Sequence, residues 1–177
     1  GSYTVEVTVT QDSKEPDLSL KVGQSVDDGI GMIFWVDPSD KMVGKAVSVK
    51  RQGGNPFEAS VMSHNALSTV NGYANTALFT APAANDAVAY CQSLGEGWYL
   101  PARDELWELF DVYNGIGHAD PDFASVVPDK LTEVEKAARA AFDKMLTDLQ
   151  GDVINEAAGS GNGESYWLST ENAAGDK

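Results

Sequence analysis

The stretch from Gly97 to Phe110, GWYLPARDELWELF, constrains the fold more than any other part of the chain. Its aromatic and apolar run up to Pro101 is too short for a helix and predicts an extended segment. Beyond Pro101 the spacing becomes that of one helix face, with apolar side chains at Leu106, Leu109, Phe110 and Tyr113. The stretch therefore predicts an extended entry into the core, then an amphipathic helix over about residues 102–114. It contains no catalytic constellation.

Two further helices follow from similar signals. One begins at Pro82, runs through about Leu94 and stops at Gly95. The other is the longest, and Thr132 and Glu135 have the spacing of a capping box at its start. Its apolar stripe comprises Leu131, Val134, Ala138, Ala141, Met145 and Leu149.

The strands are predicted from apolar runs and alternation. Met32–Val36 has the composition of a buried central strand, and residues 45–50 alternate, so the two predict a hairpin across residues 37–44. Residues 166–169 predict another strand. Residues 57–78 predict irregular structure, in long ordered loops. Residues 3–10 alternate cleanly and precede a polar linker, so we divide the chain into an N-terminal strand and linker (1–22) and a main domain (23–177). That first strand ends an upstream module or adds an edge here, and we favour the edge because one strand cannot fold alone.

The charge of the chain limits its partners. It carries 27 acidic and 12 basic residues, a net charge of −15. Residues 81–177 contribute 18 acidic and 6 basic residues, or −12. Such a chain repels phosphate backbones and anionic membrane surfaces, so we expect no nucleic-acid partner and no membrane insertion. The longest uncharged run, residues 59–85, is too rich in Ser, Asn, Thr and Gly for a transmembrane helix.

No metal site, cofactor or catalytic residue is predicted. Cys91 is the single cysteine, which excludes an intrachain disulfide within this sequence and a cysteine-based zinc cluster. We expect it as a buried, unmodified thiol on the apolar side of its helix. His64 and His118 have no partners at metal-binding spacing. The pair in Asp120-Pro121-Asp122 lacks the oxygen-rich run of a calcium loop, so we interpret it as solvated loop acids.

Several segments together resemble a known family. They are the apolar strand Gly31-Met32-Ile33-Phe34-Trp35-Val36-Asp37, the segment Asn71-Gly72-Tyr73-Ala74-Asn75-Thr76, the helix with Cys91, GWYLPARDEL, and Tyr166-Trp167-Leu168-Ser169-Thr170-Glu171. In this order they resemble a bacterial surface-protein domain of the C-type-lectin-like superfamily. Relatives of that domain are the C-terminal lectin-like domain of bacterial collagen-like adhesins and the major paralogous domain of gut-bacterial secreted proteins. The resemblance implies an α+β fold with a twisted, mainly antiparallel sheet, two or three helices and long ordered loops.

The chain departs from the family pattern at three places. Ala102 stands where the family has a Ser or Thr that would cap the helix together with Glu105. Leu168 replaces the first serine of the last motif. Family domains continue past that motif into closing strands, so we expect residues 23–177 to lack them, or the sheet to be completed differently.

The resemblance implies a non-catalytic adhesion or ligand-binding domain, extracellular or at the cell surface. Its partners would be a glycan or a host or extracellular protein, beside other domains of the same surface protein. Two alternatives stay open. One is a purely structural module, and the other is a diverged enzyme like the formylglycine-generating oxidases, which share an L-P-x-x-x-E segment. The resemblance implies that those oxidases use paired cysteines, and Cys91 is alone.

Long loops are where we expect a ligand. Residues 52–76 and 155–165 qualify, and in the second region the candidate binding residues are Asn155, Glu156, Asn162 and Glu164. Their amides and carboxylates suit sugar hydroxyls or a basic protein surface. The alternative is that both regions are ordinary solvated loops. Tryptophans 98, 107 and 167 could stack on a sugar, but we favour core positions for them and for Trp35. We predict one buried cluster of Trp98, Leu100, Leu106, Phe110 and Trp167.

Overall fold

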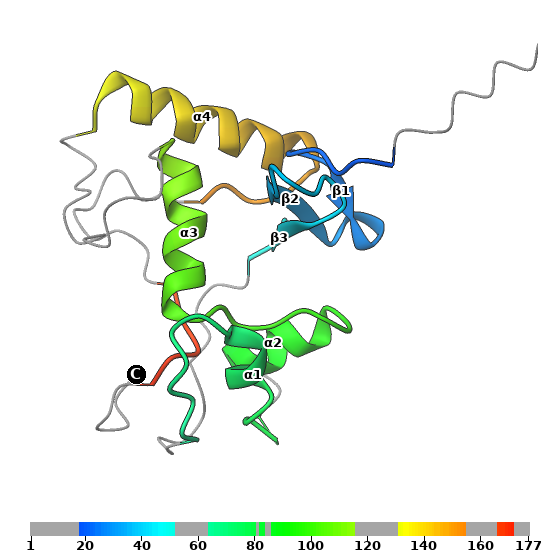
Figure 1. The fold of residues 1–177 in the computed structure, drawn as a ribbon, viewed down its shortest axis with the longest axis vertical. Coiled ribbons are helices and arrows are strands. Elements are labelled where there is room, and N and C mark those ends of the chain that lie inside the picture. The colour runs from blue at the N-terminus through cyan, green and yellow to red at the C-terminus, as the bar shows by residue number, and fades with distance from the viewer. Residues whose placement is uncertain are drawn as a thin grey trace, which may run out of the picture.

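The fold is α+β, built from a small antiparallel sheet and four helices (Figure 1). The computed structural model describes residues 18–51, 64–80, 82–83, 86–115, 131–154 and 166–171, and the element count refers to these residues. In chain order the elements are β1 (Ser25–Val26), the 3-10 turn η1 (Asp27–Gly29), β2 (Gly31–Val36), β3 (Gly44–Ser48), α1 (Gly72–Thr76), α2 (Ala87–Ser93), α3 (Arg103–Asn114) and α4 (Glu133–Asp148). The predicted strand over residues 3–10 lies outside the described residues.

The sheet is centred on β2, in the order β1-β2-β3 with both pairs antiparallel. Residues 31–34 of β2 are buried, as an apolar central strand should be. The predicted hairpin is confirmed, with Met32 opposite Val47. Asp37 closes its turn by accepting hydrogen bonds from the Ser39 amide (2.7 Å) and hydroxyl (2.6 Å). These bonds favour the carboxylate and lower the pKa of Asp37.

The two longest helices begin and end where the sequence predicts. α3 starts after Ala102 and stops at Gly115, which adopts a left-handed conformation (φ 65°) that glycine tolerates without strain. α4 has the predicted capping box, in which Thr132 Oγ1 accepts from the Glu135 amide (3.3 Å) and the Glu135 carboxylate accepts from the Thr132 amide (2.6 Å). A Cβ on Gly115 would lie 2.7 Å from Cβ of Ala138, so glycine also lets α3 and α4 approach closely.

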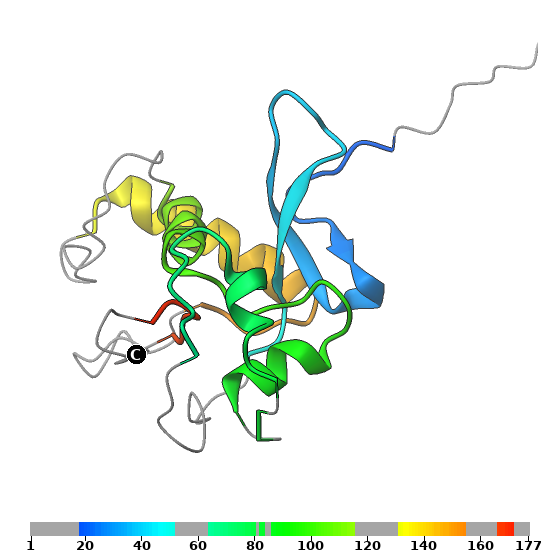
Figure 2. The same cartoon turned by 60° about the horizontal axis from the view of Figure 1, so that its bottom comes forward.

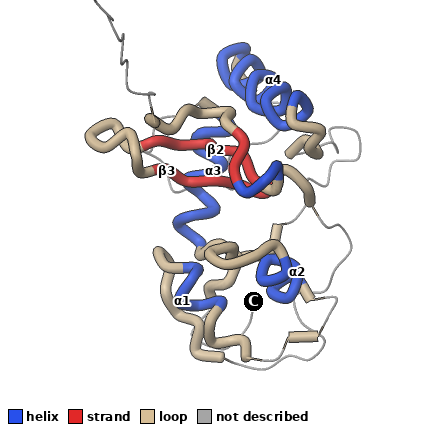
Figure 3. The backbone as a smooth tube through the Cα atoms, turned by 90° about the vertical axis from the view of Figure 1, so that its right-hand side faces the viewer, coloured by secondary structure: helices blue, strands red, loops and turns tan. Residues whose placement is uncertain are grey.

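The apolar side chains form two clusters rather than one. The first joins the sheet to α3 and α4 and comprises Met32, Phe34, Val49, Phe110, Tyr113, Phe142, Leu146 and Ile154. The second lies around α2 and comprises Ala66, Phe79, Ala87, Val88 and Leu100. Figures 1 and 3 show the matching arrangement of elements, with the sheet and α4 at one end, α1 and α2 at the other, and α3 running between them. In Figure 2, α1 and α2 come forward.

The predicted single cluster is therefore wrong. Leu100 belongs to the second cluster and Phe110 to the first, while Leu106 is only partly buried. Trp98 is half-buried and Trp167 is 44% exposed. The reason lies at Pro101, where the chain turns before α3, so that residues on its two sides point into different clusters.

Three predicted elements need correction. α2 begins at Ala87 rather than Pro82, because Asp86 forms a turn with Ala83 in which its Oδ2 accepts the Ala83 amide (2.7 Å). Residues 166–169 form no strand. They make isolated backbone bonds instead of a ladder: the Ser169 amide donates to the Pro101 carbonyl (2.7 Å). The region predicted as irregular contains the short helix α1, which the Asn71 side chain caps by accepting from the Ala74 amide (2.8 Å).

Candidate functional site

The motifs singled out in the sequence meet beside the N-terminus of α3, in what we call the motif junction. Glu105 is its centre. One carboxylate oxygen accepts from the amides of Ala102 (2.8 Å) and Gly72 (2.9 Å), and the other accepts from the Tyr99 hydroxyl (3.0 Å). Half of a capping box thus survives although Ala102 has no side-chain acceptor. The Gly72 amide supplies an additional donor to Glu105 from a distant part of the chain.

Gly72 has no room for a side chain. A Cβ there would lie 2.5 Å from the Ala102 nitrogen, 2.5 Å from the Leu100 carbonyl oxygen and 2.6 Å from the Glu105 carboxylate. Those are polar atoms held by the junction, so a side chain would displace the backbone itself. The glycine is needed here for close approach rather than for an unusual backbone angle.

Buried amide and hydroxyl groups tie the last motif to the same junction. Asn75 donates to the Ser68 carbonyl (2.7 Å) and to the Ser169 hydroxyl (3.2 Å), and Ser169 is fully buried. The Thr76 hydroxyl accepts from the Leu100 amide (3.1 Å). Polar groups removed from water need such partners to avoid a desolvation cost.

Glu171 completes the junction. It is buried, and its carboxylate accepts from the backbone amides of His64 (3.0 Å) and Ala66 (3.4 Å). Thr170 accepts from the Arg103 amide (2.9 Å) and donates to the Ser68 carbonyl (2.8 Å). The hydroxyls and carboxylates of the motifs thus form hydrogen bonds with backbone groups. These bonds join three segments that are distant in sequence, residues 64–76, 99–105 and 169–171.

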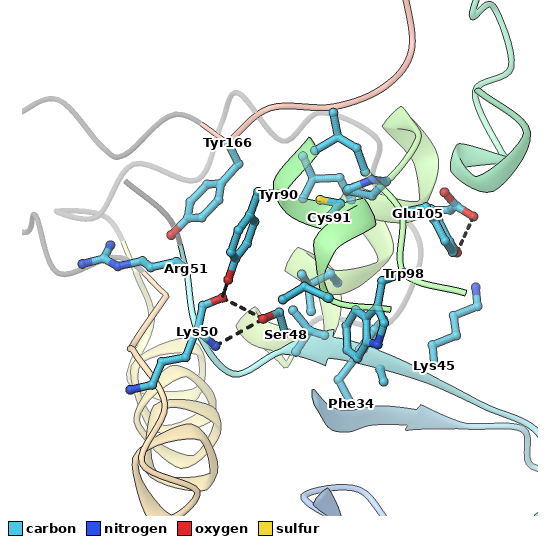
Figure 4. A pocket seen from close by; sticks show the side chains of 18 of the residues that line it. Phe34, Lys45, Ser48, Lys50, Arg51, Tyr90, Cys91, Trp98, Glu105 and Tyr166 are labelled. Atoms are coloured by element: carbon cyan, nitrogen blue, oxygen red, sulfur yellow. Dashed lines mark hydrogen bonds between the residues drawn. The ribbon is translucent and has the colours of Figure 1, made fainter. Parts of the chain in front are cut away.

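A pocket of about 960 Å³ opens between β3 and α2 (Figure 4). This volume is at the upper end for ligand sites, which run roughly 300–1,000 Å³. Leu100, Leu106 and Phe110 line its apolar part, while Tyr90 of α2 and Trp98 contribute aromatic rings. Members of both apolar clusters therefore line the pocket.

Polar contacts hold the walls of the pocket in place. The Tyr90 hydroxyl donates to the Lys50 carbonyl (2.8 Å), which ties α2 to the end of β3. The Lys50 ammonium lies 3.7 Å from Asp152. Trp98 donates from its indole N–H to Asp27 (2.8 Å), and Asp27 has a left-handed backbone (φ 50°) that is uncommon for a residue other than glycine.

Two ionisable groups in the pocket stay protonated near neutral pH. Burial raises the pKa of the Cys91 thiol to about 11, so little reactive thiolate is present. Cys91 is free and half-buried, which agrees in part with the predicted buried thiol. Burial, followed by the negative charge of Glu105, raises the pKa of Tyr99 to about 12.

The predicted binding residues Asn155, Glu156, Asn162 and Glu164 lie outside the described residues. The residues on either side of that segment, Ile154 and Tyr166, both line the pocket. The other predicted region, 52–76, is described only from His64 onward. That part builds the motif junction, while Arg51, which precedes the region, lines the pocket.

No metal site is seen in the part of the chain that the structure describes, where no three His, Cys, Asp or Glu side chains form a metal-binding group. His64 packs against Phe79 instead, with ring centroids 4.1 Å apart. His118, Asp120 and Asp122 lie outside the described residues. Within the described ranges, no helix is long and apolar enough to cross a membrane.

None of the four tryptophans is fully buried. The predicted core position is confirmed in part for Trp35, which packs against the first cluster, and is wrong for Trp167, which is 44% exposed. Arg103 lies over the ring of Trp107, 4.7 Å from its centroid, and Lys45 lies 5.4 Å from that of Trp35. These rings each have a cation over one face, at the edge of the core. Trp98 and the more exposed Trp167 line the pocket.

The sequence did not reveal the pocket wall formed by Lys50 and Tyr90. These residues are 40 positions apart and belong to none of the motifs, so only the fold brings them together. Searches against protein-family models, curated proteins and solved structures find no match for this chain.

Proposed function

We propose that this chain is a non-catalytic ligand-binding domain of C-type-lectin-like architecture that acts in adhesion, outside the cell or at its surface. Its ligand would be a glycan or an extracellular protein, and the site would be the pocket between β3 and α2. The observation that carries the proposal is the pocket itself: about 960 Å³, with an apolar part, aromatic rings and a few fixed polar groups. Such a mixed lining is typical of specific ligand sites.

The exposed aromatic side of the pocket favours binding over a purely structural role. Trp167 is 44% exposed and lines the pocket, immediately after the segment that holds Asn155 and Asn162. An exposed aromatic ring suits recognition because it offers a ligand an apolar surface. The amides of the predicted loop, which lies outside the described residues, would offer hydrogen bonds. The structural-module alternative is supported by the motif junction, which uses its polar groups for folding.

The enzyme alternative has less support. Oxidase chemistry of the kind implied by the resemblance needs paired cysteines, and this sequence has Cys91 alone. Burial raises the pKa of that thiol to about 11, which opposes formation of the nucleophilic thiolate.

The experiment is a glycan array together with a pulldown of extracellular proteins, followed by affinity measurements on variants. Trp167→Ala should weaken binding of the ligand that either screen finds. Trp107→Ala is the matched control, because Trp107 is half-buried on α3 and does not line the pocket. The fourfold alanine variant of Asn155, Glu156, Asn162 and Glu164 tests the predicted loop. No ligand in either screen, or equal affinity for Trp167→Ala and the unchanged chain, would overturn the proposal.

A further inference from the structure

The outer edge of β3 runs along the pocket. Every residue from Gly44 to Ser48 lines it. Successive side chains of a strand point to opposite faces of the sheet, so a pocket that touches all five residues includes the edge of the strand, in addition to the face that carries Phe34 of β2. Figure 4 shows the end of this strand, with Ser48 and Lys50, opposite Tyr90 and Cys91 of α2.

The main chain of β3 offers hydrogen-bonding groups to this pocket. The backbone of Ile33 is turned to the β1 side, where its N–H donates to the Gln24 carbonyl (2.9 Å) and its carbonyl accepts from Gly23 (2.8 Å). Ala46 lies opposite Ile33, so the two form a non-hydrogen-bonded pair and the N–H and C=O of Ala46 face outward.

The same alternation applies two residues further along. The Val49 amide donates to the Ile30 carbonyl (2.9 Å), so the N–H and C=O of Ser48, one residue earlier, also face outward. Among the described residues no strand pairs with this edge, because the sheet order ends at β3. Ala46 and Ser48 together present two donors and two acceptors at the spacing of a β-strand.

We propose that the protein ligand is an extended segment of a partner polypeptide, which adds to β3 as a further strand; this rests on the function proposed above. Its main chain bonds to Ala46 and Ser48. The side chains on one of its faces enter the pocket, over Leu106 and Phe110. A polypeptide main chain is the ligand whose donors and acceptors alternate at the same spacing as those of β3, and strand addition is an established way of recognising peptides.

Charge favours an acidic partner segment. Residues 44–51 carry Lys45, Lys50 and Arg51 and no acidic residue, within a chain of net charge −15. Lys45 and Lys50 lie at the two ends of the pocket edge, and their side chains are 43% and 59% exposed. Each also pairs with an acidic side chain of this chain, Glu108 and Asp152, so an acidic partner segment would share these lysines with them. Oppositely charged side chains on adjacent strands stabilise pairing. The partner segment therefore carries apolar residues at alternate positions and Glu or Asp between them.

The test uses the full chain and a blocked peptide, Thr-Val-Glu-Val-Thr-Val-Glu-Val, measured by titration calorimetry. Two further versions of the peptide carry backbone N-methyl groups, one at the odd-numbered positions and the other at the even-numbered positions. Only one of these two sets of peptide N–H groups can face β3. The version methylated on that set loses its main-chain hydrogen bonds and should bind at least about tenfold more weakly. The other version should retain its affinity. Absence of binding by the unmodified peptide, or equal weakening by both sets, would overturn strand addition.

Variants of the chain supply the second arm. Ala46→Pro removes an outward N–H that the sheet does not use, so the fold should survive while peptide binding falls. Lys45→Gln should weaken binding of this acidic peptide, and Lys41→Gln is its control because Lys41 lies in the hairpin turn away from the pocket. A glycan or protein whose affinity depends on Trp167 but is unaffected by Ala46→Pro would overturn strand addition and leave the proposed function standing.

Discussion

Glu105 gives the sharpest test of how this domain is held together. Its carboxylate is the common acceptor for two backbone amides and one tyrosine hydroxyl, from Gly72, Ala102 and Tyr99. Gly72 and Ala102 are buried, so water does not replace the carboxylate when it is removed. Glu105→Ala therefore leaves two buried donors without a partner, while the Tyr99 hydroxyl, which is only half-buried, regains water.

The expected loss follows from those two donors. Each buried group left unsatisfied costs about 1–3 kcal/mol, so Glu105→Ala should lower the free energy of unfolding by about 2–6 kcal/mol. Glu105→Gln keeps an oxygen for the two amides and loses only the charge, so we expect a loss of about 1 kcal/mol. Glu108→Ala is the matched control one turn along α3. It removes a surface pair with Lys45, which is worth roughly 0–1 kcal/mol.

The assay is urea unfolding followed by tryptophan fluorescence and by circular dichroism, with coincidence of the two probes as the check for a two-state transition. We expect the unchanged chain to be the most stable, Glu108→Ala and Glu105→Gln to be slightly less stable, and Glu105→Ala to be much less stable. If Glu105→Ala and Glu108→Ala lose the same amount, the junction is not the organising contact that the structure indicates. Should Glu105→Ala fail to fold, the glutamine variant still tests the role of the charge.

Other predictions concern titration, reactivity and the buried serine. The raised pKa of Tyr99 means that the folded state holds the phenol proton more tightly than the unfolded state. Its contribution to the free energy of unfolding is therefore full below the unfolded pKa of 10 and is lost as pH rises towards 12. Tyr99→Phe should reduce this loss of stability at high pH, whereas Tyr73→Phe, at an exposed position, should not. Cys91 of the native chain should react slowly with a thiol reagent at neutral pH, and fast only once denaturant unfolds the chain. Fast labelling of the native chain would contradict its raised pKa. Ser169→Ala should cost about 1–3 kcal/mol in chemical unfolding, because the Asn75 amide loses a buried acceptor, and an unchanged midpoint would exclude that bond as a stabilising one.

Local signals in the sequence predicted the elements that depend on local physics. α3 follows from its apolar stripe and from Gly115, and α4 from its stripe and the capping box of Thr132 and Glu135. The β2–β3 hairpin follows from alternation on both sides of a turn closed by Asp37. In each case the residues that determine the element lie only a few positions apart, so the element can be predicted from the sequence alone.

Elements that depend on distant partners were not predictable in the same way. Residues 166–169 have the composition of a strand, yet the Ser169 amide donates to the distant Pro101 carbonyl, and no neighbouring strand pairs with these residues in the described fold. The tryptophans are apolar enough for a core, but Arg103 and Lys45 stack on two of them at its edge. The pocket has no sequence signature at all, because its walls come from elements that meet only in three dimensions.

The motif junction and the pocket share a wall, which connects folding to recognition. Pro101 accepts the Ser169 amide on the junction side and also lines the pocket, and Glu105 belongs to both as well. Contacts that fix the backbone at residues 100–105 therefore also fix the surface that the proposed ligand would meet. A site held in this way loses little conformational freedom on binding, which favours affinity without any additional contact. Residues 100–105 would thus act in the proposed binding through rigidity, by holding Leu100 and Leu106 in the pocket wall near β3.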